Sequence, residues 1–568
     1  MPVRALRAVP AAWACALALL MLGPALGRGF VLTFDMVWVP DLAVRSDFLG
    51  LGPALPRAVP SDLVVALLDQ VLPGMLLQKV VLLGALVAGG LGIARLVGRS
   101  VLAQLVAISV YVWSPYVVER LWLGHWPVLL CWAALPWLVR EGVRHRDDGR
   151  IGAALPFLLL IGSLSANAGL MSAVTLLAVG LTARRGPAVR LVLLVAAANA
   201  PWVVAGLLHT GSATTAATGV FALRGEGSLP APLAALSSGG IWNAAVVPGS
   251  RETVLAWVSL LVLLALAAAG VRSAWRRLGG RTAWALLALW GTGIGLAVWS
   301  WAAPGSLGWF AAHVPGGGLL RDGSRALALA APLTAVMVAA GAERVAERAR
   351  VAAGEVAVRV LVGVGAALFP LAMLPDAAWG ISGELAPATY PDEYAQVREL
   401  LAQPPPGDLL VLPFTSYRAP EWNHGRRVLD PLPRYLQPNY VVSDELAVDG
   451  RILPGEDPRT PEVLDALAEP DAESRARELE ALGIGMVARE LDVPSTPEYD
   501  APVAGRTLFH GTQLELVALA APVDRETTSG SRAVVAVAWT AFASVALVGG
   551  WNVFHIIWRA NTRKRRRR

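Results

Sequence analysis

Carboxylates, a histidine and arginines gather in the short connections between the long apolar segments of this sequence. The first of them, Asp35, follows an apolar run within a few residues and is flanked by Phe34 and Trp38. A charge among apolar and aromatic residues at a membrane edge is costly unless it is hydrated, paired or working. Asp35 is therefore the first candidate general base, although a solvated loop acid, with Asp41 and Asp47 nearby, explains the same position.

A second connection, residues 114–126, holds two further groups that can exchange protons. Glu119 and His125 are suited to acid–base work, and Arg120 between them can hold an anion. An aromatic belt with an ordinary Glu–Arg pair accounts equally well for the same residues. We keep Glu119 and His125 as catalytic candidates and Arg120 as a phosphate-binding candidate.

A glycine-rich turn at 316–318 precedes two arginines, Arg321 and Arg325. Open backbone N–H groups, a following helix N-terminus and guanidinium groups together suit a phosphate. Lys79 lies about one turn inside another apolar run and can reach the same layer, although snorkelling to the interface explains it too. We therefore predict Arg120, Arg321, Arg325 and Lys79 as the phosphate-binding set.

These residue types in one layer suit group transfer from a lipid phosphate. A carboxylate would take the proton from an acceptor hydroxyl while arginines stabilise the charge that develops on the leaving phosphate. Metal-ligand spacings such as HxxxH or CxxC, the GxSxG elbow and a Walker loop do not occur in the sequence. Hydrolase and NTPase functions therefore lose support, and we predict no protein-held metal.

The elements that position these residues are membrane helices. Of the 568 residues 55% are hydrophobic, 16% are charged, and the mean hydropathy is +0.55, which is typical of an integral membrane protein. The net charge of +6 follows from arginines at span ends, so we expect no nucleic-acid partner. Arginine clusters occupy every second connection, which predicts that both termini are cytoplasmic. The arginine-rich, lysine-poor composition favours a bacterial cytoplasmic membrane. The clusters are Arg4/Arg7, Arg95/Arg99, Arg140–Arg150, Arg184–Arg190, Arg272–Arg281, Arg344–Arg359 and Arg563–Arg568.

Apolar runs predict about twelve transmembrane helices. Eleven belong to a membrane domain at 1–375, and the last belongs to a segment at 531–568 with a basic cytoplasmic tail. The pair 151–167 and 169–183 is short for a bilayer, so the count is open by two. A cleaved signal peptide over residues 1–27 is the alternative to the first span. The expected spans are 10–28, 75–97, 101–117, 126–141, 151–167, 169–183, 189–208, 253–271, 282–302, 326–344, 356–375 and 533–558, and the expected outer loops are 29–74, 118–125, 209–252 and 303–325.

Residues 376–530 contain no run long enough to span a membrane and read as a small extracytoplasmic α/β domain. Helix-then-strand patterns occur at 392–403 and 408–413, and again at 473–482 and 484–489, and residues 507–519 read as paired strands.

A long segment of this domain, 414–455, has little periodicity but many aromatic and ionic residues, which argues against disorder. Its residues Trp422, His424, Arg427 and Tyr435 are the candidates for binding a glycan acceptor.

With Asp35 after the first span, and with SPYVVERLWLGHW (114–126) and GLLRDGSR (318–325), the chain resembles the polytopic GT-C glycosyltransferases. The likeness is to arabinofuranosyltransferase-like and YfhO-like membrane proteins. It implies an all-α polytopic bundle with a small α/β domain before the last helix, and a base at Asp35. It also implies a polyprenyl-phosphate-sugar donor and a cell-envelope glycan or lipid acceptor. The adjacent acidic pair common in the first loop of several such families is missing here, which leaves a divalent cation and the identity of the base open.

Two other classes share many of these features. A transporter or flippase for a lipid-linked envelope precursor would also have many spans, but transporters usually carry charges at mid-membrane and repeated halves. The sequence has no clear internal repeat, and Lys79, near one edge of its span, is the nearest thing to such a charge. A non-catalytic envelope protein that binds glycan is the third reading. Convergence of Asp35, Glu119 and Arg321 on one cavity is the structural test of the composite site.

Overall fold

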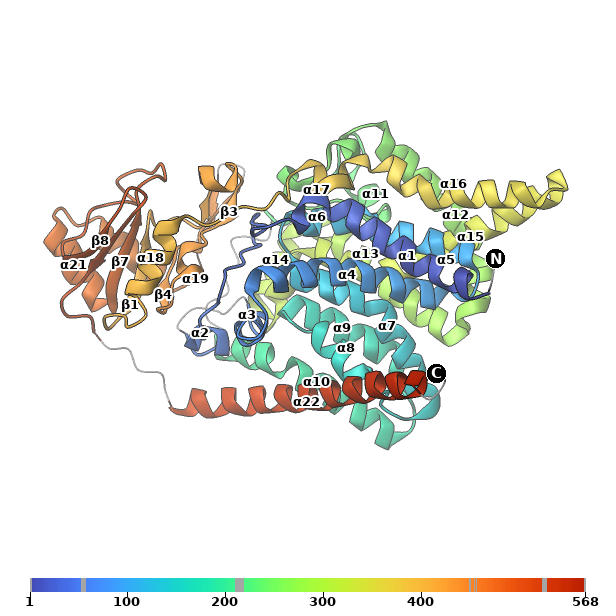
Figure 1. The fold of residues 1–568 in the computed structure, drawn as a ribbon, viewed down its shortest axis with the longest axis horizontal. Coiled ribbons are helices and arrows are strands. Elements are labelled where there is room, and N and C mark those ends of the chain that lie inside the picture. The colour runs from blue at the N-terminus through green and yellow to red at the C-terminus, as the bar shows by residue number, and fades with distance from the viewer. Residues whose placement is uncertain are drawn as a thin grey trace.

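The protein is described here by a computed structural model that covers 3–52, 58–209, 219–448, 451–453, 455, 457–523 and 529–565. Part of the expected loop 209–252, at 210–218, and the tail residues 566–568 lie outside the described residues. Figure 1 shows a helical part with a sheet domain at one of its ends. The first helix begins, and the last helix ends, at the opposite end of the helical part, which we call the far end.

Eight helices in the described part of the chain are long and apolar enough to cross a membrane, and a bent pair adds a ninth. This protein is therefore a multi-pass membrane protein, but the predicted count of about twelve spans is not confirmed. The nine segments are α1 (Val3–Leu22) continued by η1 (Gly23–Leu26), α4 (Gly74–Val97), α5 (Val101–Val112) with α6 (Pro115–Trp122), α10 (Arg185–Leu208), α12 (Val254–Leu278), α13 (Gly280–Ala302), η5 (Gly323–Leu329) bent by 48° against α15 (Ala331–Ala353), α16 (Val356–Met373) and α22 (Ser529–Arg565).

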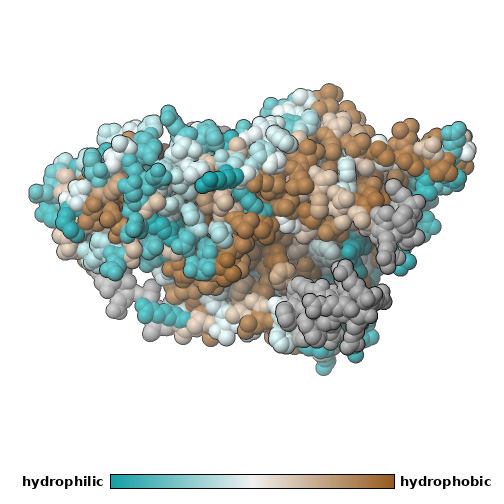
Figure 2. Space-filling view, viewed as in Figure 1, coloured by the Kyte–Doolittle hydropathy of each residue, from teal (hydrophilic) through white to brown (hydrophobic). Residues whose placement is uncertain are grey.

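Apolar residues form the belt expected of such helices. Figure 2 shows brown, apolar side chains over the middle of the helical part, with hydrophilic surface on the sheet domain and at the far end. Exposed apolar residues of this belt include Leu261, Leu361 and Leu547, which are 60–75% exposed. Exposing such side chains to water would cost free energy, whereas exposing them to lipid would not. A lipid environment therefore explains their exposure.

One expected span lies inside the bundle, and two others are shorter in the structure than predicted. The segment 126–141 lies in α7 (Trp126–Asp148), which is packed inside the bundle: Trp132 is fully buried and stacks on Tyr111 at 4.4 Å. The pair 151–167 and 169–183 forms α8 (Leu155–Ile161) and α9 (Ala166–Gly180), of seven and fifteen residues. Each is too short for a hydrocarbon core of about 30 Å.

Short elements connect the spans. Of those labelled in Figure 1, α2, α3 and α14 lie toward the sheet domain. They are α2 (Ser46–Leu49), α3 (Ser61–Leu68), α11 (Ala231–Leu236), η2 (Ala244–Val246), η3 (Gly249–Glu252), α14 (Pro304–His313), η4 (Gly317–Leu320), η6 (Pro375–Ala377) and α17 (Ala378–Ser382).

The sheet domain contains a five-stranded mixed sheet in the order β4-β1-β7-β9-β8. β1 pairs in parallel with β4 and β7, and β9 pairs antiparallel with β7 and β8. Two two-stranded hairpins, β2–β3 and β5–β6, accompany it. The strands are β1 (Asp408–Leu412), β2 (Tyr417–Arg418), β3 (Val428–Leu429), β4 (Tyr440–Val441), β5 (Leu446–Val448), β6 (Arg451–Leu453), β7 (Ile484–Glu490), β8 (Arg506–His510) and β9 (Leu514–Ala518).

The predicted helices and strands of this domain are confirmed. The helices are α18 (Asp392–Leu400), η7 (Glu421–Asn423), α19 (Leu432–Tyr435), α20 (Arg459–Leu467) and α21 (Ala472–Ala481). β1 alternates between two cores: Leu410 joins the cluster that includes Val463 and Leu479, while Leu409 joins the cluster that includes Tyr394. Both faces of the sheet are therefore covered, as expected for parallel strands.

The first loop ties the sheet domain to the helical part through three charged groups. Arg434 forms a bidentate ion pair with Asp62, with Nη–Oδ distances of 2.6 and 2.8 Å. Arg398 pairs with Asp41 at 2.7 Å. Arg45 is 3% exposed and donates to the carbonyls of Pro433 at 2.9 Å, Gln437 at 3.2 Å and Leu436. The sheet domain is thus held in one position by contacts between residues more than 350 apart in sequence.

Candidate active site

Asp35 lies where the first loop passes between the helical part and the sheet domain. The preceding residue, Phe34, has a left-handed backbone with φ of 42°, and its N–H donates to the Arg427 carbonyl at 2.7 Å. The Asp35 N–H donates to the Leu123 carbonyl at 3.1 Å. The loop is therefore held from both sides, while 40% of the Asp35 side chain stays exposed.

Gly124 allows this loop to approach the connection that carries His125. Its φ is 85°, and a Cβ placed there would lie 2.2 Å from the Met36 nitrogen. Only glycine combines the positive φ with so small a volume. The close approach brings His125 beside Asp35.

Two side chains donate hydrogen bonds to the Asp35 carboxylate. Tyr417, in β2 of the sheet domain, donates its O–H to Oδ1 at 2.6 Å. The Nε2 atom of His125 lies 3.2 Å from Oδ2. Because each carboxylate oxygen has two lone pairs, one remains on each oxygen for a further donor such as a substrate hydroxyl.

The tautomer of His125 follows from its second neighbour. Arg120 Nη1 lies 3.2 Å from Nδ1 of the ring, and a guanidinium can only donate. Nδ1 therefore accepts, and the ring proton sits on Nε2, where it points at Asp35. Arg120 thus fixes the orientation of the donor that faces the carboxylate.

Arg120 is fully buried and linked onward to the turn that precedes α15. Its Nη2 donates to Ser324 Oγ at 2.5 Å, and its Nη1 lies 3.6 Å from Asp322. Ser324 in turn donates to Asp322 at 2.5 Å. Asp322 is 4% exposed and also pairs with Arg325 at 2.9 Å. One buried carboxylate is therefore shared between two arginines.

The protonation states follow from these contacts. Desolvation alone would raise the pKa of Asp35, but hydrogen bonds from His125 and Tyr417 and the charge of Arg325 hold it below its usual value. Desolvation, together with the charge of Arg325, lowers the pKa of His125 to about 4. At neutral pH the pair is therefore a carboxylate and a neutral imidazole.

Arg325 and Arg321 are the more accessible cations of this region. The Arg325 side chain is 28% exposed. With its amide oxygen turned toward Arg325, Asn167 accepts from Nη1 at 2.8 Å and donates to the Leu319 carbonyl at 2.8 Å. Arg321 lies over the Phe221 ring at 5.2 Å. Arg325 is close enough to Asp35 to act on its pKa.

Two predicted residues lie elsewhere. Glu119 is 1% exposed and faces the Glu226 carboxyl, which is itself paired with Arg251 at 2.5 Å. Lys79 is 9% exposed, and the contact that the structure gives it is Gln78 Oε1 at 3.5 Å. The structure therefore brings together Asp35, His125, Arg120 and Arg325, but not Glu119 or Lys79. The expected convergence of Asp35, Glu119 and Arg321 on one cavity is not met, because Glu119 faces Glu226.

The predicted acceptor residues divide into two groups. Trp422 and Tyr435 pack with Tyr390 at centroid distances of 5.2 and 4.8 Å, and they form part of the core beneath the sheet. His424 is exposed and lies 3.2 Å from the Pro387 carbonyl. Arg427 is exposed and lies 5.9 Å from the Tyr417 ring, so it stands near the Asp35 carboxylate.

Sequence reasoning missed Tyr417, Asp322 and Ser324 as members of the site. Tyr417 lies in the aperiodic segment 414–455 that was singled out, but nothing local distinguishes it from the other tyrosines there. Asp322 and Ser324 lie between the two predicted arginines, Arg321 and Arg325. Because a buried arginine needs a partner of opposite charge, this position beside the arginines could have indicated Asp322.

In the ranges that the structure describes, no group of three or more His, Cys, Asp or Glu side chains could hold a metal ion. The Asp35 site in particular offers one carboxylate and one imidazole, whose lone pair on Nδ1 is engaged by Arg120.

Comparison with known proteins identifies the fold. No protein-family model and no curated protein sequence matches this chain. Two solved structures do: the mycobacterial arabinofuranosyltransferase AftD, with a TM-score of 0.54 and 18% identity over 93% of this chain, and a mutant form of AftD, with 0.53 and 17% over 92%. The aligned region is 40–42% of those chains, so this chain spans less than half of their length. The fold of this protein is therefore that of a GT-C-like arabinofuranosyltransferase, as the sequence resemblance implied.

Proposed function

We propose that this protein is a glycosyltransferase that transfers a sugar from a polyprenyl-phosphate donor to a cell-envelope glycan or lipid. The observation that carries the proposal is the Asp35 carboxylate, which is partly exposed at the junction of the two parts and carries two aligned donors. The shared fold with AftD supports it.

In the proposed step the oxygen of the acceptor hydroxyl attacks the anomeric carbon of the donor sugar. The bond from that carbon to the phosphate oxygen breaks, and the electron pair leaves on the polyprenyl phosphate. Asp35 accepts the hydroxyl proton on a lone pair that His125 and Tyr417 do not use. A single carboxylate acting in this way inverts the configuration at the sugar carbon.

The arginines divide into two roles. Arg325 and Arg321, the accessible ones, stabilise the charge on the leaving phosphate. Arg120 is fully buried with His125, Ser324 and Asp322 around it, so we assign it a positioning role in place of phosphate binding. Arg427, over Tyr417, is placed to contact the acceptor.

We propose that the sheet end faces the outside of a bacterial cytoplasmic membrane. Arginine-rich connections gather at the far end, as the positive-inside rule requires of the cytoplasmic side. Both chain termini would then be cytoplasmic and residues 376–530 extracytoplasmic.

The test is sugar transfer by the purified full-length protein from a panel of decaprenyl- and undecaprenyl-phosphate sugars. We expect turnover with at least one donor and a loss of about 10²–10⁴-fold in Asp35→Asn, the range for a lost general base. The matched control is Asp41→Asn, from the same loop, whose amide oxygen can still accept from Arg398. Parallel assays with a chelator determine whether a divalent cation takes part.

Three results would overturn the proposal. Full activity in Asp35→Asn would remove Asp35 as the base. Translocation of lipid-linked sugar across vesicles without turnover of any donor would favour the flippase, and glycan binding with neither activity would favour a binding protein.

A further inference from the structure

At the far end, helices α12 and α15 cross with their backbones in close contact. Arginines follow the crossing point on both helices. A Cβ at Gly270 would lie 1.9 Å from the Met337 carbonyl oxygen, and one at Gly341 would lie 1.8 Å from that of Leu266. The absence of side chains here lets the backbones touch. Beyond the contact, Arg272 and Arg276 extend from α12 and Arg344 from α15.

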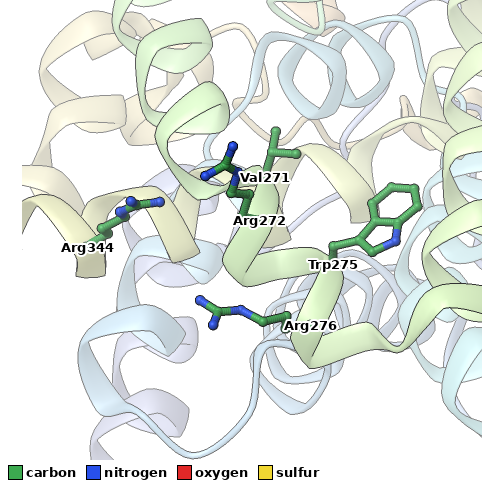
Figure 3. A pocket seen from close by; sticks show the side chains of 5 residues that line it. All are labelled: Val271, Arg272, Trp275, Arg276 and Arg344. Carbon is green, nitrogen blue, oxygen red and sulfur yellow. The ribbon is translucent and has the colours of Figure 1, made fainter.

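The three arginines border one recess with a volume of about 490 Å³, which Val271 and Trp275 also line. Figure 3 shows the guanidinium groups of Arg272 and Arg276 directed toward the side on which Arg344 approaches from the other helix. Arg272 and Arg276 are exposed and Arg344 is half-buried.

These arginines differ from their neighbours in lacking carboxylate partners. Close by, Arg277 pairs with Glu343, and Arg350 pairs with Glu347 at 2.7 Å. These two glutamates border an adjoining recess that Arg276 and Arg344 also line. Within the described part of the chain, no Asp or Glu lies within salt-bridge distance of Arg272, Arg276 or Arg344. Three positive charges therefore converge on a recess that holds no negative one.

The recess is also at the level where lipid headgroups lie. α12 is a candidate span that ends at Leu278, a turn and a half beyond Arg272. Trp275 stands edge-on to Trp284 at 5.0 Å, and exposed tryptophans mark the membrane–water interface. Val271, which is 41% exposed, gives the recess an apolar wall on its membrane side.

We propose that this recess binds the phosphate headgroup of an anionic membrane lipid. Guanidinium groups are the preferred partners of phosphate because they donate paired hydrogen bonds. A free phosphate would satisfy the same cations, but it would have no use for the apolar wall or for the tryptophan pair. The headgroup bridges α12 and α15, and α15 continues the bent segment that holds Arg325 in the Asp35 site.

The test measures how much phosphatidylglycerol the full-length protein retains. The protein is released from nanodiscs of phosphatidylglycerol and phosphatidylcholine, and native mass spectrometry detects the lipid that stays bound to it. We expect the double variant Arg272→Gln, Arg276→Gln to bind on the order of twentyfold less, from about fivefold for each arginine near an anionic surface. The matched control, Arg184→Gln with Arg185→Gln, removes two exposed arginines at the start of α10 and should change retention less than twofold.

Further arms keep the proposal falsifiable. Arg344→Lys keeps the charge but loses the paired geometry, so a several-fold loss is expected even if the double variant folds poorly. Equal losses in the recess and control variants would overturn the proposal in favour of a general surface charge. Displacement of the lipid by millimolar inorganic phosphate would also overturn it, because the site would then select free phosphate.

Discussion

The two ends of the helical part use arginine in opposite ways. At the sheet end Arg120 is fully buried, and its guanidinium is engaged by His125, Ser324 and Asp322. At the far end Arg272 and Arg276 are exposed and border a recess without a carboxylate. A buried arginine fixes the geometry of its neighbours, whereas an exposed one attracts a ligand through its charge. The two ends should therefore respond differently to mutation, pH and salt.

The largest effect is expected from Arg120→Gln. This change leaves Asp322 buried with Arg325 as its remaining cation, and removing one partner of a buried pair costs about 3–5 kcal/mol. The exposed Arg185→Gln should stay within about 0.5 kcal/mol of the wild type. Unfolding of the purified protein in detergent measures both. Equal losses would mean that burial does not distinguish the two ends.

His125→Leu should move the acid limb of the transfer rate. The wild type holds the pKa of Asp35 below its usual value, so its rate should stay level as the pH falls through the ordinary range of an aspartate. Losing a donor to the carboxylate raises that pKa, so the acid limb should shift to higher pH. A pH profile of kcat/KM measures the shift.

The control for His125→Leu is His313→Leu, which removes an exposed histidine on α14. An unshifted limb in His125→Leu, at a reduced rate, would mean that His125 supports the fold and not the carboxylate.

Tyr417→Phe should act in the same direction with a smaller effect. The hydroxyl donates to Asp35 at 2.6 Å from an exposed position, where water can replace it. We expect a smaller upward shift than in His125→Leu in the same profile, with unchanged thermal stability. A larger loss of stability than of rate would show that β2 docks the sheet domain and does not tune the base.

The smallest effect at the sheet end is expected from salt. Raising ionic strength from 0.1 to 1 M shortens the screening length from about 10 to 3 Å, which weakens exposed charges and spares buried ones. Retention of phosphatidylglycerol should fall several-fold. The unfolding temperature of the protein, to which the buried Arg120 contacts contribute, should change little. Equal sensitivity of both would remove the distinction between the ends.

The loops that carry Asp35, His125 and Arg325 could be predicted because arginine placement separates the two membrane faces. The direction in which each of these side chains points could not be predicted. Residues 118–125 were expected to be a loop, but α6 extends through Trp122, and helical residues one position apart point about 100° apart. Arg120 therefore turns toward the site while Glu119 turns toward Glu226.

That the expected span at 126–141 lies inside the bundle could not be predicted, for a related reason. Apolar composition is the same whether a helix meets lipid or other helices, and α7 with its buried Trp132 meets helices. Tyr417 was beyond sequence reasoning because it reaches Asp35 from 382 residues away, through a pairing of the first loop with β3 that no local pattern encodes.

That separation has a consequence in time. A chain is made from its N-terminus, so Asp35 and His125 are synthesised long before Tyr417. Until the sheet domain folds and its Arg434 meets Asp62, the carboxylate has one of its two side-chain donors. The last third of the chain therefore completes a site that the first quarter begins, and a truncated product would carry the residue proposed as the base in an unfinished setting.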